Sequence, residues 1–303
     1  MCAGGWAIEA AEALRTSGEA VDLLSRLVEQ SLVVAEPHGS SMRYRYLHPI
    51  RLYARERLEA AGEADGAARA HAEHLLALAE EADGMLAGAR QREWLDRLEQ
   101  DHANLREALW WLRVRGGAWE DLRMAAALWR FWWLRGYATE GRDTLRGLLR
   151  RAGAAPPAPE RTRTLQSLGE LAWRQGDWAE ARETLESALR VARMWGDRRA
   201  IAEAERSLSR LAIEEGSHAE ARALLDSCPR TERELDARRG LPVTLSHLGW
   251  LALAEERPEQ AEEHLREALA LSREIGDQVG VAVQLLSLAE VALERGESDA
   301  AGA

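Results

Sequence analysis

The 303-residue chain contains no lysine, so all 40 of its basic residues are arginine. A phosphate-binding loop of the GxxxxGK[ST] type needs a lysine for the β- and γ-phosphates, and Schiff-base chemistry needs a lysine amine. The absence of lysine excludes both from this chain. The formal net charge of −11 also argues against broad, non-specific binding of nucleic acid, which depends on neutralising phosphates.

Cysteine is scarce, with only Cys2 and Cys228 in the chain. Cys228 falls at a core position of the repeats described below, which favours a packed free thiol over a disulfide. No apolar run approaches the ~20 residues of a membrane-spanning helix. Residues 1–5 have neither the basic start nor the apolar run of a signal peptide. We therefore expect a location in the reducing cytoplasm and no membrane partner.

Motifs of enzymes and metal sites are missing as well. The chain has no GxSxG or HExxH motif and no plausible pairing of a cysteine with a histidine. His71 and His74 lie at positions i and i+3 of a predicted helix, but no further cysteine or histidine motif completes a metal site. We expect a protein that is not an enzyme and that holds no metal or other cofactor.

What the chain does contain is a repeat with a period of 40 residues. A leucine followed by a small residue occurs at Leu168-Gly169, Leu208-Ser209, Leu248-Gly249 and Leu288-Ala289, and faintly at Leu128-Trp129. Seven positions further on stand Gly136, Gly176, Gly216 and Gly296, with Glu256 as the exception, and after twelve positions stand Gly141, Ala181, Ala221, Ala261 and Ala301. Catalytic sites do not recur in this way, whereas stacked repeat proteins do.

Each repeat predicts a pair of amphipathic helices. In the third repeat the helices cover residues 163–174 and 178–193, with a turn at Gly176 between them. Gly169 and Ala181 are small where these two helices approach each other. A single pair cannot bury its apolar face, so neighbouring pairs must stack into an α–α superhelix. Pro229 stands where other repeats have leucine and should shorten or kink the second helix of its repeat.

Residues 1–62 predict a partial winged-helix-like domain. Short helices are expected over residues 8–14 and 21–30, strands over 31–35 and 42–47 with a turn at 37–41, and a helix over 49–61. Residues 63–117 predict a helical connector with helices at 71–82 and 91–114 and a degenerate repeat. The array then covers residues 118–303, with a Pro-rich linker at 154–159 and an incomplete last repeat. The fold class is therefore mainly α, with one β-hairpin near the N-terminus.

The repeat resembles the tetratricopeptide repeat, whose usual unit is about 34 residues. Further motifs at residues 4–11, 24–28, 31–34, 44–54, 94–98, 102–106 and 128–132 resemble the C-terminal half of bacterial STAND-type signalling ATPases, which are related to LuxR- or SARP-type transcription regulators. The resemblance implies a winged helix followed by a sensor array, with an ATPase domain upstream in complete family members. It also implies that the winged helix usually closes onto the nucleotide domain. From the incomplete last repeat and the missing opening elements of the winged helix, we expect the chain to be the C-terminal part of something larger, either a fragment or a shortened open reading frame.

Three residues near the predicted hairpin are candidates for contacts with phosphate or nucleotide. Some members of the family carry a Met-His-Asp motif whose histidine contacts the bound nucleotide; ungapped alignment places Leu47 at that position, and His48 falls one residue late. The resemblance thus makes His48 a candidate for a nucleotide-sensing role. In the alternative interpretation, His48 ends the hairpin, is partly exposed and has no such role. Arg43 and Arg45 could contact phosphate, or they could form ion pairs within the domain.

The main candidate site is the concave face that the first helix of each repeat lines in tetratricopeptide arrays. Its predicted residues are Arg130, Trp133, Arg163, Gln166, Glu170, Trp173, Arg174, Arg206, Arg210 and Trp250. Tryptophan and arginine together suit a protein, peptide or small effector with carboxylates and apolar groups. Alternatively, the tryptophans fill the core and the arginines form a solvated face. We expect a regulatory or sensor module in signal transduction or transcription, with DNA binding through the winged helix as the alternative.

Overall fold

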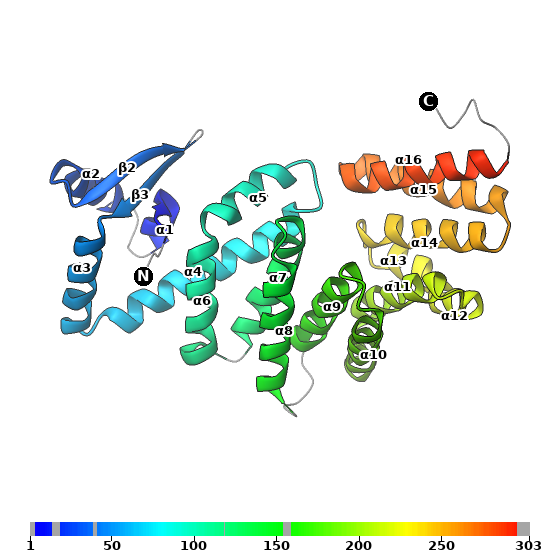
Figure 1. Ribbon diagram of the computed structural model, residues 1–303, viewed down its shortest axis with the longest axis horizontal. Coiled ribbons are helices and arrows are strands. Elements are labelled where there is room, and N and C mark those ends of the chain that lie inside the picture. Colours follow the sequence, from blue (N-terminus) through cyan, green and yellow to red (C-terminus); the bar gives the residue numbers. More distant parts are fainter. Residues whose placement is uncertain (1–3, 14–18, 39–40, 118, 154–158, 296–303) are drawn as a thin grey trace. The chain divides into compact units, whose positions relative to one another are not determined.

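A computed structural model describes residues 4–13, 19–38, 41–117, 119–153 and 159–295 (Figure 1). The chain divides into two compact units, one formed by Met1–Asp83 and Arg92–Phe131 and the other by Gly84–Gln91 and Trp132–Ala303. Most of the linker predicted at 154–159 lies outside the described residues, as do Cys2 and the repeat positions Gly296 and Ala301. The division into three parts at 62/63 and 117/118 stays a prediction.

The first unit begins with a winged-helix-like arrangement. Its elements are β1 (Trp6–Ala7), α1 (Ile8–Ala13), α2 (Glu19–Glu29), β2 (Val33–His38), β3 (Ser41–Tyr46) and α3 (His48–Ala60). The strands form an antiparallel sheet in the order β1-β3-β2. The predicted hairpin is confirmed, but Pro37 and His38, which we expected in its turn, pair with Met42 and Ser41 as the last residues of β2.

The alternation of arginine and tyrosine in β3 explains how this sheet acquires its core. Tyr44 and Tyr46 point to one face, because successive strand side chains alternate, and they pack with Trp6 of β1. The rings of Trp6 and Tyr46 lie 4.7 Å apart. Leu24 of α2 and Val33 of β2 complete the cluster. Burial of this face fixes the register of the hairpin, because a slip by one residue would expose both tyrosines.

Three helices follow in place of the two that the sequence predicted, namely α4 (Ala64–Met85), α5 (Gln91–Gln100) and α6 (His102–Arg115). The prediction of one continuous helix over 91–114 is wrong because the helix breaks at Asp101. The buried carboxylate of Asp101 accepts a hydrogen bond from Asn104 Nδ2 at 2.9 Å. It also accepts one from Arg43 Nη2 at 2.9 Å. The Asp101 carboxylate at this break is therefore held by two side chains, and it makes no hydrogen bond to the backbone N–H groups of α6.

Helix pairs make up the rest of the chain. They are α7 (Glu120–Leu134), α8 (Ala138–Ala152), α9 (Pro159–Arg174), α10 (Trp178–Trp195), α11 (Arg198–Glu214), α12 (His218–Leu225), α13 (Cys228–Glu234), α14 (Gly240–Ala254), α15 (Pro258–Ile275) and α16 (Gln278–Glu294). Helix α7 begins in the first unit and ends in the second. We call α7, α9, α11, α14 and α16 the first helices. In the described part of the chain, no helix is long and apolar enough to cross a bilayer.

Close contact within each pair depends on small residues at the repeated positions. A Cβ atom added at Gly169 of α9 would lie 2.6 Å from Leu185 Cγ of α10. Two repeats later, a Cβ atom added at Gly249 of α14 would lie 2.7 Å from Leu265 Cγ of α15. Ala181 is fully buried beside Leu185 in the cluster between α9, α10 and α11. The 40-residue period therefore records where two helices meet with no room for a larger side chain.

The fourth repeat departs from the pattern at Pro229, as predicted. Its second helix ends at Leu225, and a new helix, α13, begins at Cys228 with Pro229 in its first turn. A proline ring clashes with the carbonyl of the residue four positions earlier, which here is that of Leu225. Cys228 is a buried free cysteine among the described residues. Burial raises the pKa of its thiol to about 12, and the nearby Glu205 and Glu232 carboxylates act in the same direction.

Ion pairs between successive repeats recur with the same period. Arg182 pairs with Glu215 at 2.5 Å, and Arg222 with Glu255. At the next equivalent position the signs are reversed, and Glu262 pairs with Arg295 at 2.6 Å. Each pair joins the beginning of a second helix to the end of the following first helix. The pairs therefore reinforce the stacking order, although each is partly exposed and contributes little on its own.

Candidate functional site: the inner face of the repeats

Successive first helices contact one another along the array, from α9 to α11, from α11 to α14 and from α14 to α16. Polar side chains of neighbouring first helices meet at these contacts. We call the side of the array formed by these helices the inner face. Five of the predicted groove residues come together on it around α9, namely Trp133, Glu170, Trp173, Arg174 and Arg210.

Glu170 of α9 and Arg210 of α11 form a largely buried ion pair. Arg210 Nη2 lies 3.2 Å from each carboxylate oxygen of Glu170, and Ser207 Oγ donates to Oε1 at 2.7 Å. The two side chains are only 14% and 10% exposed. Burial alone would raise the pKa of Glu170, but the charges of Arg210 and Arg174 outweigh it and hold the pKa at about 2. Glu170 is therefore ionised at neutral pH and fixes the position of Arg210.

Tryptophan and arginine alternate in a column beside this pair. The guanidinium carbon of Arg174 lies 4.9 Å from the ring centre of Trp133 and 5.3 Å from that of Trp173. The guanidinium carbon of Arg210 lies 3.5 Å from the ring centre of Trp173. Trp173 Nε1 also donates a hydrogen bond of 3.1 Å to Glu214. A guanidinium within about 6 Å of a ring centre is attracted electrostatically by the face of the ring.

The inner face continues through α14 with a buried histidine. His247 is 1% exposed and stacks on Trp250, with ring centres 5.1 Å apart. Its Nδ1 lies 3.2 Å from Ser209 Oγ and 3.1 Å from the carbonyl oxygen of Arg206. Burial, and then the charges of Arg210 and Arg206, lower its pKa well below the ordinary value. The imidazole is therefore neutral.

The remaining predicted groove residues have separate surroundings. Trp250 Nε1 donates to Ser287 Oγ at 2.8 Å, and Gln166 Nε2 donates to the carbonyl oxygen of Ala200 at 3.0 Å. Arg206 pairs with the buried Glu232. Arg163 is exposed on the first turns of α9. Arg130 lies in the other compact unit, where it pairs with Asp83 at 2.9 Å and covers the ring of Trp129.

The candidates near the hairpin are engaged in contacts inside the first unit. Arg43 Nη2 donates to the carbonyl oxygens of Gly5 and Gln100 at 3.1 and 3.0 Å and to Asp101, and its side chain is 13% exposed. Arg45 pairs with Glu36 across the hairpin at 2.8 Å. His48 Nδ1 lies 3.4 Å from Arg51 Nη2. The contacts of Arg43 and Arg45 correspond to the alternative of ion pairing within the domain, and His48 is exposed next to the end of the hairpin.

Among the described residues, no group of three or more potential metal ligands occurs around His71 and His74 or elsewhere. Burial lowers the pKa of both side chains, to about 4 for His71. Sequence reasoning missed three residues of the inner face, namely Ser207, Glu214 and His247. The opposite charges of Glu170 and Arg210, at the same position of adjacent repeats, were a usable signal for their pairing.

Residues 160–228 match the tetratricopeptide repeat family. That matched stretch runs from α9 to the start of α13, within the array. The chain is also 34% identical over 151 residues to proteins named "Putative HTH-type transcriptional regulator" in Mycobacterium bovis and Mycobacterium tuberculosis. That match covers 48% of this chain and only 17% of the length of each relative.

Two solved structures align with most of the chain. One is a STAND protein with a tetratricopeptide repeat sensor from Pyrococcus horikoshii, with a TM-score of 0.55, 14% identity, and coverage of 98% of this chain and 46% of that one. The other is NprR in complex with its cognate peptide NprX, with a TM-score of 0.56, 14% identity, and coverage of 95% and 72%. At these identities the alignments establish a shared fold. Because one of them is a STAND protein, the resemblance stated from the sequence is confirmed at the level of the fold.

Proposed function

We propose that this chain is a non-catalytic sensor region of a cytoplasmic signalling or transcription regulator, which binds a peptide effector on the inner face of its repeats. The column of Trp133, Arg174, Trp173 and Arg210 carries the proposal. It combines flat apolar surface with guanidinium groups, and arginine and tryptophan are the residues that most often dominate peptide and protein interfaces. In a longer regulator with an upstream ATPase domain, peptide capture would select one arrangement of the stacked repeats.

The chemistry of the inner face indicates what the peptide should carry. Glu170 and Ser207 fix Arg210, and Arg210 in turn supports the ring of Trp173 from one side. Arg163 is exposed and Arg174 is partly exposed on the same helix. Guanidinium groups bind carboxylates in a bidentate manner, while the tryptophan edges suit aliphatic side chains. The expected effector is therefore a short peptide with acidic groups and leucine-like side chains. NprR, a structural neighbour, was solved with a cognate peptide.

We expect short synthetic peptides of acidic and aliphatic residues to bind the chain in calorimetric titrations, and basic peptides of equal length not to bind. Arg163→Gln and Trp173→Ala should each weaken binding about tenfold or more, because each removes a contact worth roughly 1.4 kcal/mol or more. Arg190→Gln and Trp195→Ala are matched controls, since both residues are exposed on the second helix α10. Equal affinity in Arg163→Gln and Arg190→Gln, or no binding by the acidic peptides, would refute the proposal.

DNA binding through the winged helix receives less support. The second helix of a helix-turn-helix enters the major groove, and the corresponding helix here, α2, has the sequence EAVDLLSRLVE with Arg26 as its single basic residue. Arg43 and Arg45 already pair with acidic side chains. We therefore expect no mobility shift with generic duplex DNA at low salt. A shift that disappears in the double variant Arg43→Ala, Arg45→Ala would instead favour the DNA-binding alternative.

A further inference from the structure

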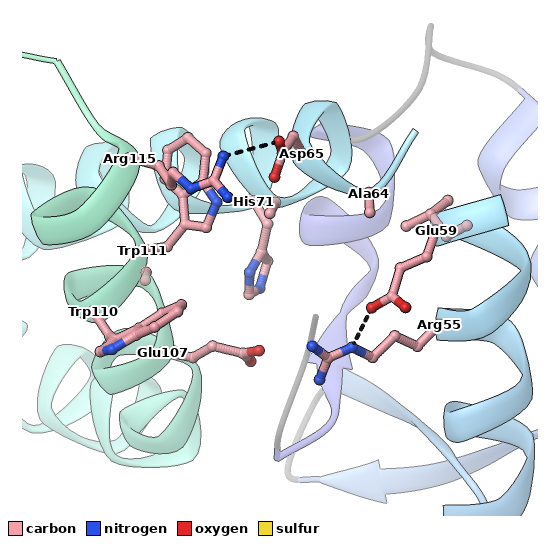
Figure 2. A pocket seen from close by; sticks show the side chains of 12 residues that line it. Arg55, Glu59, Ala64, Asp65, His71, Glu107, Trp110, Trp111 and Arg115 are labelled. Atoms are coloured by element: carbon pink, nitrogen blue, oxygen red, sulfur yellow. Dashed lines mark hydrogen bonds and ion pairs between the residues drawn. The ribbon is translucent and has the colours of Figure 1, made fainter. Parts of the chain in front are cut away.

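A cavity of about 310 Å³ lies within the first unit, among α3, α4 and α6 (Figure 2). Its volume lies at the lower end of the range for small-molecule sites. The cavity is separate from the inner face of the repeats. Its lining contains charged groups from all three helices together with two adjacent tryptophans, Trp110 and Trp111.

Opposite charges face each other across this cavity. Figure 2 shows the guanidinium of Arg55, from α3, and the carboxylate of Glu107, from α6, directed toward the same space from opposite sides. Arg55 uses its Nε to donate to Glu59 Oε1 at 2.9 Å, and that pair is 68% and 53% exposed. An exposed pair within one helix is weak, and guanidinium carries further donors on its two terminal nitrogens. Arg55 can therefore bind a carboxylate without losing its contact with Glu59.

Aromatic side chains and one charge-compensated pair contribute to the lining of the cavity. Trp110 is 63% exposed at the cavity, which is unusual for so large an apolar side chain. His71 lines the cavity from α4, and burial lowers its pKa to about 4, so it is neutral at and above pH 6. Arg115 and Asp65 also line the cavity, and they form an ion pair of 3.3 Å whose charges cancel. The unlike charges of Arg55 and Glu107 are thus separated by a neutral surface with an aromatic face.

We propose that this cavity binds a small zwitterion of the α-amino acid type with an apolar side chain. The ligand carboxylate would bind the Arg55 guanidinium, and the ligand ammonium would bind the Glu107 carboxylate. The apolar side chain would lie against Trp110, whose ring face also attracts the neighbouring ammonium group. The site would give the regulator a small-molecule input in addition to the proposed peptide input.

Three probes with the same benzyl side chain separate the contributions of the two charges. They are L-phenylalanine, its amide, which lacks the carboxylate, and N-acetyl-L-phenylalanine, which lacks the ammonium. In calorimetric titrations of the full chain at about pH 6, where the amide is mostly protonated, L-phenylalanine should bind about tenfold or more tighter than either blocked form. No saturable binding of L-phenylalanine up to ~10 mM would overturn the proposal.

Substitutions at the two charged residues should change this discrimination in opposite ways. Arg55→Gln should remove the preference for L-phenylalanine over the amide, and Glu107→Gln should remove the preference over the N-acetyl form. Arg57→Gln and Glu56→Gln are matched controls, because both residues are exposed on α3 and neither lines the cavity. Thermal unfolding of each variant establishes that it is folded. Preferences that stay unchanged in Arg55→Gln and Glu107→Gln would assign the binding elsewhere and contradict the proposal.

Discussion

Replacing Ala181 with glutamate is expected to lower the melting temperature of the chain by roughly 10 °C or more. Ala181 is 0% exposed in the cluster that joins α9, α10 and α11. A carboxylate placed there would lose its water and find no room beside Leu185, at a cost of about 4 kcal/mol or more. Ala179→Glu is the matched control, because Ala179 lies two positions earlier on the same helix and is exposed.

The result is read from thermal unfolding followed by circular dichroism. The control variant should melt within a few degrees of the parent, since surface substitutions usually change stability by less than about 0.5 kcal/mol. Equal melting temperatures for Ala181→Glu and Ala179→Glu would show that the 40-residue register does not place Ala181 between the helices. The assignment of the inner face depends on the same register, so it would be lost as well.

Replacing Glu170 with glutamine is expected to destabilise the chain by about 3 kcal/mol at neutral pH. Glutamine keeps the shape of the side chain but leaves the charge of Arg210 buried without its carboxylate partner. Glu183→Gln, at an exposed position of α10, removes the same charge without this penalty and serves as the control. Adding Arg210→Gln to Glu170→Gln should restore part of the lost stability, because the unpaired charge is then gone. Unfolding in urea measures all four proteins.

The effect of Glu170→Gln should also depend on pH. The pKa of Glu170 is lowered from 4.5 to about 2 in the folded chain. A carboxyl group with a depressed folded-state pKa stabilises the fold above its unfolded pKa, and this contribution disappears as the pH falls through the folded value. The stability difference between the parent and Glu170→Gln should therefore be constant at and above about pH 6 and shrink between about pH 4.5 and pH 2. A difference that does not change with pH would contradict the ion pair.

The repeat register could be derived from the sequence because it rests on steric requirements that recur. Gly169, Ala181 and Leu185 sit where helices approach within contact distance, so the same sizes return every 40 residues. The break at Pro229 was predictable for a similar reason, because a proline cannot continue a helix whatever surrounds it. Strand β3 was predictable because arginine and tyrosine alternate in it with a period of two residues.

Other features had no such local cause. Strand β1 contains only Trp6 and Ala7, too few residues to show any period. Asp101, at the break between α5 and α6, is bonded to Arg43, which is 58 positions away in the sequence. From the sequence, Arg43 was a candidate either for contact with phosphate or for an ion pair within the domain. The residue type alone could not decide between these two alternatives. Arg210 is buried and Arg163 is exposed, although both were predicted to line the groove. This difference follows from packing between repeats, which the position of a residue in the repeat pattern does not reveal.

Amide hydrogen exchange with and without the tightest-binding acidic peptide tests the central claim most directly. The account predicts that the peptide slows exchange in α9 and α11, around Trp173 and Arg210, and leaves the second helices α10 and α15 unchanged. Slowed exchange confined to the second helices, with none in α9 or α11, would contradict the assignment of the inner face as the binding surface.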